Sequence, residues 1–340
     1  MKKGIALFLS LVLLVLMLAS CGSQGSSSSA ASGSTAASAK DAKTTKVACI
    51  LSGPISDMSW NYTAYQGMKK IEAMGAEISY QENVDNSSLA DCINTYASDG
   101  YNVIFLSTNS YEETALPITK DYPDTQFIII NGTTTADNVT SYAVADEDQG
   151  FMQGAICALL SKTNQVGFVG AMEITPILNG RAGFEQGAKY AKPDVKINAV
   201  MTGSFTDVAA AKETSKAMIE GGVDAIAPMC DNAALGVVEA AEEGKITAVA
   251  SGEGQDTVAP NAVVCAVVKD TSIVYQKAYQ DWLDGKLDGT TGVLKLGAAD
   301  GVVYLSDWYT AGKNISQDVK DKITSVYQDL ATGKVTVKLA

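Results

Sequence analysis

The sequence predicts an α/β protein with two doubly wound parallel-sheet lobes. Short runs rich in Val and Ile alternate with longer amphipathic segments, which is the pattern of parallel strands covered by helices on both faces. The alternation runs from residue 47 to residue 132 and starts again at residue 165. About 295 residues follow the low-complexity N-terminal stretch, which is enough for two lobes of ordinary domain size.

In the first half of the chain, the alternation begins at the apolar run VACIL. This run is short and is followed by the loop SGPIS, so we expect a buried strand at 47–51. The segment YTAYQGMKKIEAM predicts a helix at 62–74. The same reasoning predicts strands at 77–82, 102–108 and 126–132, and helices at 89–100 and 112–123.

The second half repeats this plan. We expect strands at 165–172, 196–205, 224–229, 246–251 and 262–268, separated by helices at 182–192, 208–222 and 233–244. A long helix at 271–285 is expected to cross back to the first lobe, and VLKLG, VVYLS and a helix at 317–330 close the chain. We therefore expect lobe I at 45–146 and 270–290, and lobe II at 147–269 and 291–340.

The N-terminus has the pattern of an export signal. Two lysines precede the apolar run from Ile5 to Leu18, which is shorter than the span of about 20 residues that crosses a membrane. The sequence LASC that follows resembles the lipobox of bacterial lipoproteins, which implies a signal peptide at 1–20 and lipid on Cys21. Residues 21–44, rich in Ser, Gly and Ala, are expected to be a flexible tether. An ordinary signal peptide with an incidental cysteine is the alternative.

Composition limits the possible functions. Loss of residues 1–20 removes two lysines and changes the formal net charge from −13 to −15, which disfavours nucleic acid as a partner. The chain has no histidine, so histidine triads and histidine metal sites are excluded. The five cysteines other than Cys21 have no metal-ligand or C-x-x-C spacing. We expect no cofactor, no metal site and no catalytic activity.

Polar and aromatic side chains collect where the expected strands end, which is where open α/β sheets bind ligands. The first strand is followed by DMSWN, whose indole offers a flat face to a planar ligand, although it can also pack under a loop. Asp57 or Ser59 can instead cap the next helix. The candidate ligand-binding residues are Asp57, Ser59, Trp60, Asn61, Asn131, Phe205, Asp231, Gly252, Glu253 and Lys269.

This set has the chemistry of a site for a neutral polyhydroxylated or heterocyclic molecule. Arg181 is the only arginine of the chain, so the arginine cluster typical of phosphate sites is missing. Structural roles remain open for several members: Asn131 with Gly132 can form a plain turn, Phe205 can belong to the core, and Asp231 can cap a helix.

Six segments in order, DMSWN, FMQGAICALLSK, QVGFVGAM, RAGFEQGAKY, GSFTD and AVVKD, resemble the basic membrane protein family of lipoproteins. The resemblance covers about residues 46–285. It implies a type I periplasmic-binding fold, in which a hinge joins two lobes, and a role as the nucleoside-binding component of an ABC importer. It also implies that Trp60 and Asn61 form the family's aromatic–asparagine pair, that Phe205 is the second stacking aromatic, and that Lys269 contacts ribose.

Two positions depart from the family's pattern. Asn131 stands where the family commonly has an aspartate that reads the base. Gly252 stands near another common aspartate, which holds the ribose hydroxyls, and Glu253 or Asp231 is the carboxylate left to replace it. An amide can donate as well as accept, whereas an ionised carboxylate only accepts.

The resulting expectation is a lipid-anchored solute-binding protein on the extracytoplasmic face of the cell membrane. It binds a purine-type nucleoside between the lobes and delivers it to an ABC permease. A simple sugar or another small polar solute is an alternative ligand, and a signalling receptor is an alternative partner. A surface hydrolase is a further alternative, although no P-loop, nucleophile elbow or HExxH motif is present.

Overall fold

The computed structural model describes residues 42–57, 60–287 and 289–339. Cys21 and Ser59 lie outside the described residues, and so does the side chain of Asp57. No helix among the described residues is long and apolar enough to cross a membrane. The five cysteines of the described part are all buried and unpaired, as expected for small apolar side chains in a core.

The first sheet has six parallel strands in the order β11-β5-β4-β3-β1-β2. Its central strands are buried along their whole length, which explains their continuous apolar sequences. The strands are β1 (Lys46–Ile50), β2 (Glu77–Gln81), β3 (Val103–Leu106), β4 (Gln126–Ile130), β5 (Val139–Val144) and β11 (Leu294–Leu296).

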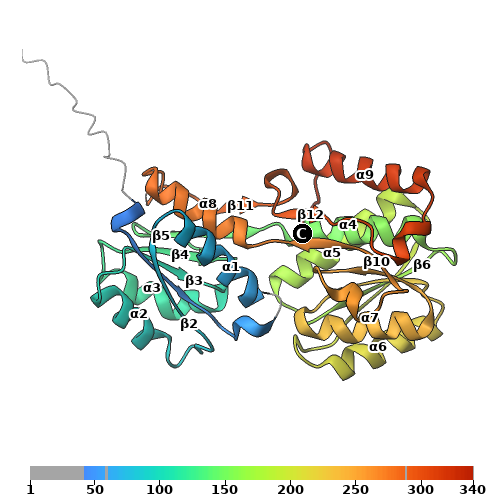
Figure 1. Cartoon of the computed structure of the whole chain (residues 1–340), viewed down its shortest axis with the longest axis horizontal. Coiled ribbons are helices and arrows are strands. Elements are labelled where there is room, and N and C mark those ends of the chain that lie inside the picture. Colours follow the sequence, from blue (N-terminus) through green and yellow to red (C-terminus); the bar gives the residue numbers. More distant parts are fainter. Residues whose placement is uncertain (1–41, 58–59, 288, 340) are drawn as a thin grey trace, which may run out of the picture. The chain divides into compact units, whose positions relative to one another are not determined.

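Helices cover both faces of this sheet (Figure 1). On one face, α1 (Trp60–Ala73) packs beside α8 (Ser272–Leu283), and a core cluster containing Met68, Ile71 and Tyr275 lies beneath them. On the other face, α2 (Leu89–Ser98) and α3 (Glu112–Thr119) cover a second cluster. The helix expected at 271–285 therefore belongs to the first lobe, as predicted.

The second sheet also has six strands, in the order β12-β10-β9-β8-β6-β7. Five are parallel, and β12 runs antiparallel to β10. The strands are β6 (Gln165–Gly170), β7 (Lys196–Met201), β8 (Ala225–Met229), β9 (Thr247–Ala250), β10 (Val263–Lys269) and β12 (Val303–Leu305).

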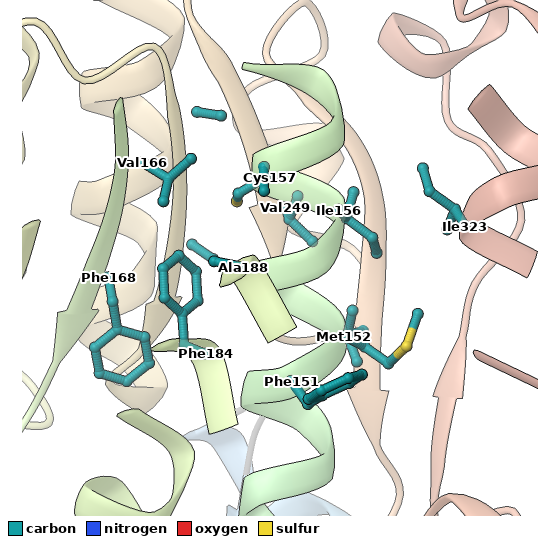
Figure 2. Packing of buried hydrophobic residues seen from close by; sticks show 14 of the residues in the cluster. Phe151, Met152, Ile156, Cys157, Val166, Phe168, Phe184, Ala188, Val249 and Ile323 are labelled. Atoms are coloured by element: carbon teal, nitrogen blue, oxygen red, sulfur yellow. The ribbon is translucent and has the colours of Figure 1, made fainter. Parts of the chain in front are cut away.

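The second sheet is likewise covered on both faces. α6 (Val208–Glu220) and α7 (Ala234–Gly244) lie on one face, and α4 (Asp146–Leu160), α5 (Thr175–Ala191) and α9 (Gln317–Ala331) lie on the other. Figure 2 shows Phe151, Met152, Ile156 and Cys157 of α4 among side chains of the neighbouring elements. Twelve residues of α4 are buried, so the helix lies inside the lobe.

The end of the chain corrects two expectations. Residues 291–340 were assigned to lobe II, but β11 pairs with β5 of the first sheet before the chain reaches β12 of the second. The second sheet is also not wholly parallel. The chain enters β12 from β11 through the short 3₁₀ turn Ala298–Asp300, and no crossover helix brings it back to the same end of the sheet. β5 and α4 were not assigned from the sequence.

Three connections join the two sheets: β5 to α4, β10 to α8, and β11 to β12. The consecutive acidic residues 146–148 at the start of α4 contact all three. Their carboxylates pair with Lys269 at the end of β10, with Lys295 in β11, and with the backbone nitrogen of Ala298. Two of the expected site residues, Lys269 and Asn131, contact Asp146 at these connections.

Candidate ligand-binding site

Two cavities that share three lining residues lie between the carboxyl ends of strands from both sheets. One has a volume of about 310 Å³, and we call it the asparagine cavity because Asn61, Asn109, Asn131 and Asn232 line it. The other, the glutamate cavity, has a volume of about 340 Å³ and is lined by Glu253. The shared residues are Trp60, Asp231 and Lys269. Both volumes are in the range of small-molecule sites.

Every candidate residue whose side chain is described lines at least one of these cavities. The asparagine cavity contains Asn61, Asn131 and Phe205, and the glutamate cavity contains Gly252 and Glu253. Parallel strands explain this grouping, because their carboxyl ends lie along one edge of each sheet. Among the described residues, no cluster of His, Cys, Asp and Glu could hold a metal ion.

Trp60 begins α1, and its ring is held from two sides. The indole Nε1 donates to the carbonyl oxygen of Ser107, at the end of β3, over 2.8 Å. On the side of the second sheet, Lys269 Nζ lies 5.5 Å from the centre of the indole ring, within cation–π range. One edge of the indole is therefore hydrogen-bonded to the first lobe, and Trp60 lines both cavities.

Phe205 reaches the asparagine cavity from the link between β7 and α6. It is partly buried and packs against the core clusters on both faces of the second sheet. Its carbonyl oxygen accepts from Ala233 N over 2.9 Å, and Asp207 caps α6 by accepting from Ala210 N over 2.9 Å. These bonds hold the loop, so the aromatic has both a packing role and access to the cavity.

Two of the three first-lobe asparagines that line the asparagine cavity accept hydrogen bonds from the backbone. Asn61 Oδ1 accepts from Gly53 N over 3.1 Å, and Asn131 Oδ1 accepts from Val144 N over 2.7 Å. Asn131 has φ of 58°, a left-handed conformation that asparagine adopts more readily than most residues. Asn131 therefore has the turn conformation that its neighbour Gly132 suggested, and it also lines the asparagine cavity.

Lys269 is placed by a buried carboxylate. Its Nζ lies 2.5 Å from Asp146 Oδ1, and the side chain of Asp146 is only 3% exposed. Burial raises the pKa of the Asp146 carboxyl above its ordinary value, and the Lys269 ammonium opposes that rise. The pair directs a cation to the boundary between the two cavities.

The glutamate cavity is the more polar of the two in side-chain chemistry. Glu253 is exposed, and its Oε1 accepts from the Tyr304 hydroxyl over 3.2 Å. Burial, with the Glu253 charge as a smaller contribution, raises the pKa of Tyr304. Asp231 begins the 3₁₀ turn Asp231–Ala233 with φ of 45° and lines both cavities.

The structure adds lining residues that sequence reasoning missed. Gln149 of α4 donates through Nε2 to the carbonyl oxygens of Ser251 and Val267, over 3.0 and 2.8 Å, and lines the glutamate cavity. It was missed because α4 itself was not assigned. Thr63, Gln66 and Lys70 line the same cavity from α1. Their i, i+3 and i+7 spacing after Trp60 is a helical face that could have indicated them.

Residues 44–337 match the model of the Bmp family, described as ABC transporter substrate-binding proteins of the PnrA-like type. The chain belongs to this family.

Relatives of this chain include a transcriptional activator, a purine-binding protein and a nucleoside-binding protein. The chain is 28% identical to the transcriptional activator protein Med of Bacillus subtilis, over 74% of this chain and 81% of that protein. It is 28% identical to a purine-binding protein of Brucella abortus, over 81% and 77% of the two chains. It is 26% identical to the ABC transporter nucleoside-binding protein BmpA of Lactococcus lactis, over 83% and 86%.

A solved structure agrees with the fold of this Bmp-family chain. The solute-binding protein of an ABC transporter system from Conexibacter woesei matches it with a TM-score of 0.73 and 20% identity, over 86% of this chain and 98% of that one. The expected two-lobe periplasmic-binding fold and the expected family are therefore confirmed.

Proposed function

We propose that this Bmp-family protein captures a purine-type nucleoside in the two cavities and delivers it to an ABC permease. The base lies in the asparagine cavity between Trp60 and Phe205. The sugar lies toward the glutamate cavity, near Lys269 and Glu253. Contacts from both lobes reach the ligand at once, so binding favours the arrangement in which the lobes enclose it.

The observation that carries this proposal is that one cavity contains two aromatic residues from different lobes. Trp60 begins a helix of the first lobe, and Phe205 lies on a loop of the second. Two flat apolar faces separated by amide groups suit a heterocycle, which stacks through its faces and hydrogen-bonds through its edge. The purine-binding and nucleoside-binding relatives support the same ligand class.

The boundary between the cavities has groups that suit sugar hydroxyls. Lys269 donates, and Glu253 and Asp231 can accept. Glu253 is the carboxylate we assign to the ribose hydroxyls, because Gly252 has no side chain and Tyr304 already holds Glu253 at the cavity.

Calorimetric titration with a panel of nucleosides and free sugars tests the proposal. We expect heat from purine nucleosides and a weakening of about 10- to 100-fold in Trp60→Ala, since loss of a base–aromatic stack costs about 1–3 kcal/mol. Trp60→Phe keeps a stacking ring, and Trp308→Phe alters a tryptophan that lines neither cavity, so both should bind nearly as the parent does. Binding of free sugars alone, or unchanged affinity in Trp60→Ala, would refute it.

The proposed location is the extracytoplasmic face of the cell membrane, with lipid on Cys21 as the anchor. Substrate-binding proteins of this family act outside the cytoplasm, and LASC precedes a tether rich in Ser and Gly. Metabolic labelling with a radioactive fatty acid should label the protein and should fail to label Cys21→Ala. Equal labelling of the two proteins would remove the anchor from the proposal.

A further inference from the structure

We propose that Asn131 makes the asparagine cavity selective for 6-oxopurine nucleosides over 6-aminopurine nucleosides. This inference rests on the proposed function and names the substrate class for the same site. The reason is that the protein backbone already bonds the oxygen of the Asn131 amide, which leaves the nitrogen for a ligand.

The orientation of the Asn131 amide is determined by a backbone donor. The atom 2.7 Å from Val144 N must be Oδ1, because a backbone N–H cannot donate to an amide NH₂ group. The backbone of Asn131 is held as well, since its N donates to the carbonyl oxygen of Tyr142 over 2.7 Å. A rotation of the amide would therefore break the bond to Val144 and place two donors in contact.

The nitrogen of the same amide faces acceptors. Nδ2 donates to Asp146 Oδ2 over a long distance of 3.4 Å, which uses one of its two hydrogens. Asp146 is 2% exposed and also bonded to Lys269, so the carboxylate holds the NH₂ group in this orientation. Because Asn131 lines the cavity, the group it offers to a ligand is a donor.

The oxygen of Asn61, in the first turn of α1, is likewise bonded to the backbone. This oxygen accepts from Gly53 N over 3.1 Å, and Asn61 is 7% exposed. The oxygens of Asn61 and Asn131, two of the three first-lobe asparagines that line the cavity, are thus bonded to the backbone. Asn109 Oδ1 accepts from the Thr108 hydroxyl over 3.4 Å. A base edge that lies against Asn131 therefore meets an amide nitrogen.

A donor edge discriminates between the two kinds of purine. A 6-oxopurine presents two adjacent acceptors, O6 and N7, whereas a 6-aminopurine presents N7 beside an amino donor. The amino group would face the Asn131 NH₂ group without a bond between them. An aspartate facing the same O6/N7 edge of the base would have the opposite preference, because an ionised carboxylate only accepts.

The test compares inosine and guanosine with adenosine and with purine riboside, which lacks the 6-substituent. Calorimetric titration of the parent protein should give at least about fivefold tighter binding of inosine than of adenosine, since a buried polar group without a partner costs about 1–3 kcal/mol. Purine riboside, which loses O6 without adding a donor, should lie between them.

Asn131→Gly removes the amide but keeps the left-handed backbone, which glycine adopts without strain. In this variant the preference for inosine over adenosine should fall to less than about threefold. Asn83→Gly, which alters another left-handed asparagine that lines neither cavity, should retain the parent preference.

Equal affinity for inosine and adenosine in the parent, or tighter binding of adenosine, overturns the inference and leaves the proposed function intact. An unchanged preference in Asn131→Gly removes Asn131 as its cause. If no nucleoside binds to the parent, the proposed function fails and this inference fails with it. Should Asn131→Gly not fold, the series of four nucleosides on the parent protein still decides the question.

Discussion

Replacing Lys269 by methionine tests the pair that joins the end of β10 to the start of α4. Methionine keeps much of the apolar stem and removes the ammonium. The Asp146 side chain is 3% exposed, and its carboxylate would then lose the lysine that forms an ion pair with it. Asn131 Nδ2, at 3.4 Å, would remain as a weak donor. Breaking a buried pair in this way typically costs 3–5 kcal/mol.

The pKa of the carboxyl gives an upper limit to this cost. A stranded carboxylate can take up a proton, and at pH 7 protonating an aspartate with an ordinary pKa of about 3.9 costs about 4 kcal/mol. The part of the loss in the free energy of unfolding that comes from the unpaired carboxylate cannot exceed this value. At pH 5 the same limit is about 1.5 kcal/mol. Because burial raises the pKa of Asp146 even beside Lys269, we expect about 2–4 kcal/mol at pH 7.

Urea unfolding followed by far-ultraviolet circular dichroism measures the effect at both pH values. The double variant Asp146→Asn/Lys269→Met removes both charges and should be clearly more stable than Lys269→Met at pH 7. In Lys269→Met the folded-state pKa of Asp146 rises above its unfolded value. Stability is therefore fully present below pH about 4 and is lost as the pH rises through the folded-state pKa.

Two results would refute this reasoning. If Lys269→Met unfolds at the same urea concentration as the parent at pH 7, the carboxylate is not stranded. If its destabilisation is the same at pH 5 and pH 7, proton uptake by Asp146 does not limit the cost.

Two further predictions concern α4. Gly154→Ala should unfold the protein or lower its melting temperature sharply, at a cost of about 3 kcal/mol or more, because a Cβ there would overlap the carbonyl oxygen of Phe184 in α5. Gly292→Ala is the control, because a Cβ at that position meets no other atom. Equal thermal melting curves for the two variants would contradict the close packing of α4 against α5. Burial raises the pKa of Asp148 from 3.8 to about 6, so its contribution to stability is full below pH about 4 and falls by up to about 3 kcal/mol as the pH rises through 6. Asp148→Asn should reduce that fall in urea titrations from pH 4 to pH 7, and identical pH profiles would exclude Asp148 as the cause.

Much of the site was accessible from the sequence because it lies at strand ends. Trp60, Phe205 and Lys269 each follow an apolar run, and parallel strands that begin at one end of a sheet must finish at the other. Trp60 and Phe205 are far apart in the sequence, but they line one cavity because the strand ends of the two sheets border the same space.

Other parts of the site could not be predicted from local pattern. α4 is buried on nearly every side, so it lacks the polar face by which helices are identified, and Gln149 was missed with it. β11 joins the first sheet and β12 the second although they are seven residues apart. Strands of three residues carry too little sequence to specify which sheet they join.

The sequence by itself determined the alternation of strands and helices and the residue types at the strand ends, since these depend on the order of neighbouring residues. Only the tertiary structure decided that Asp146 holds Lys269 and that Val144 occupies the oxygen of Asn131. Hydrogen bonds between segments far apart in the chain depend on how the strands and helices pack. The donor or acceptor that Asn131 offers a ligand is therefore a property of the fold, not of the residue type.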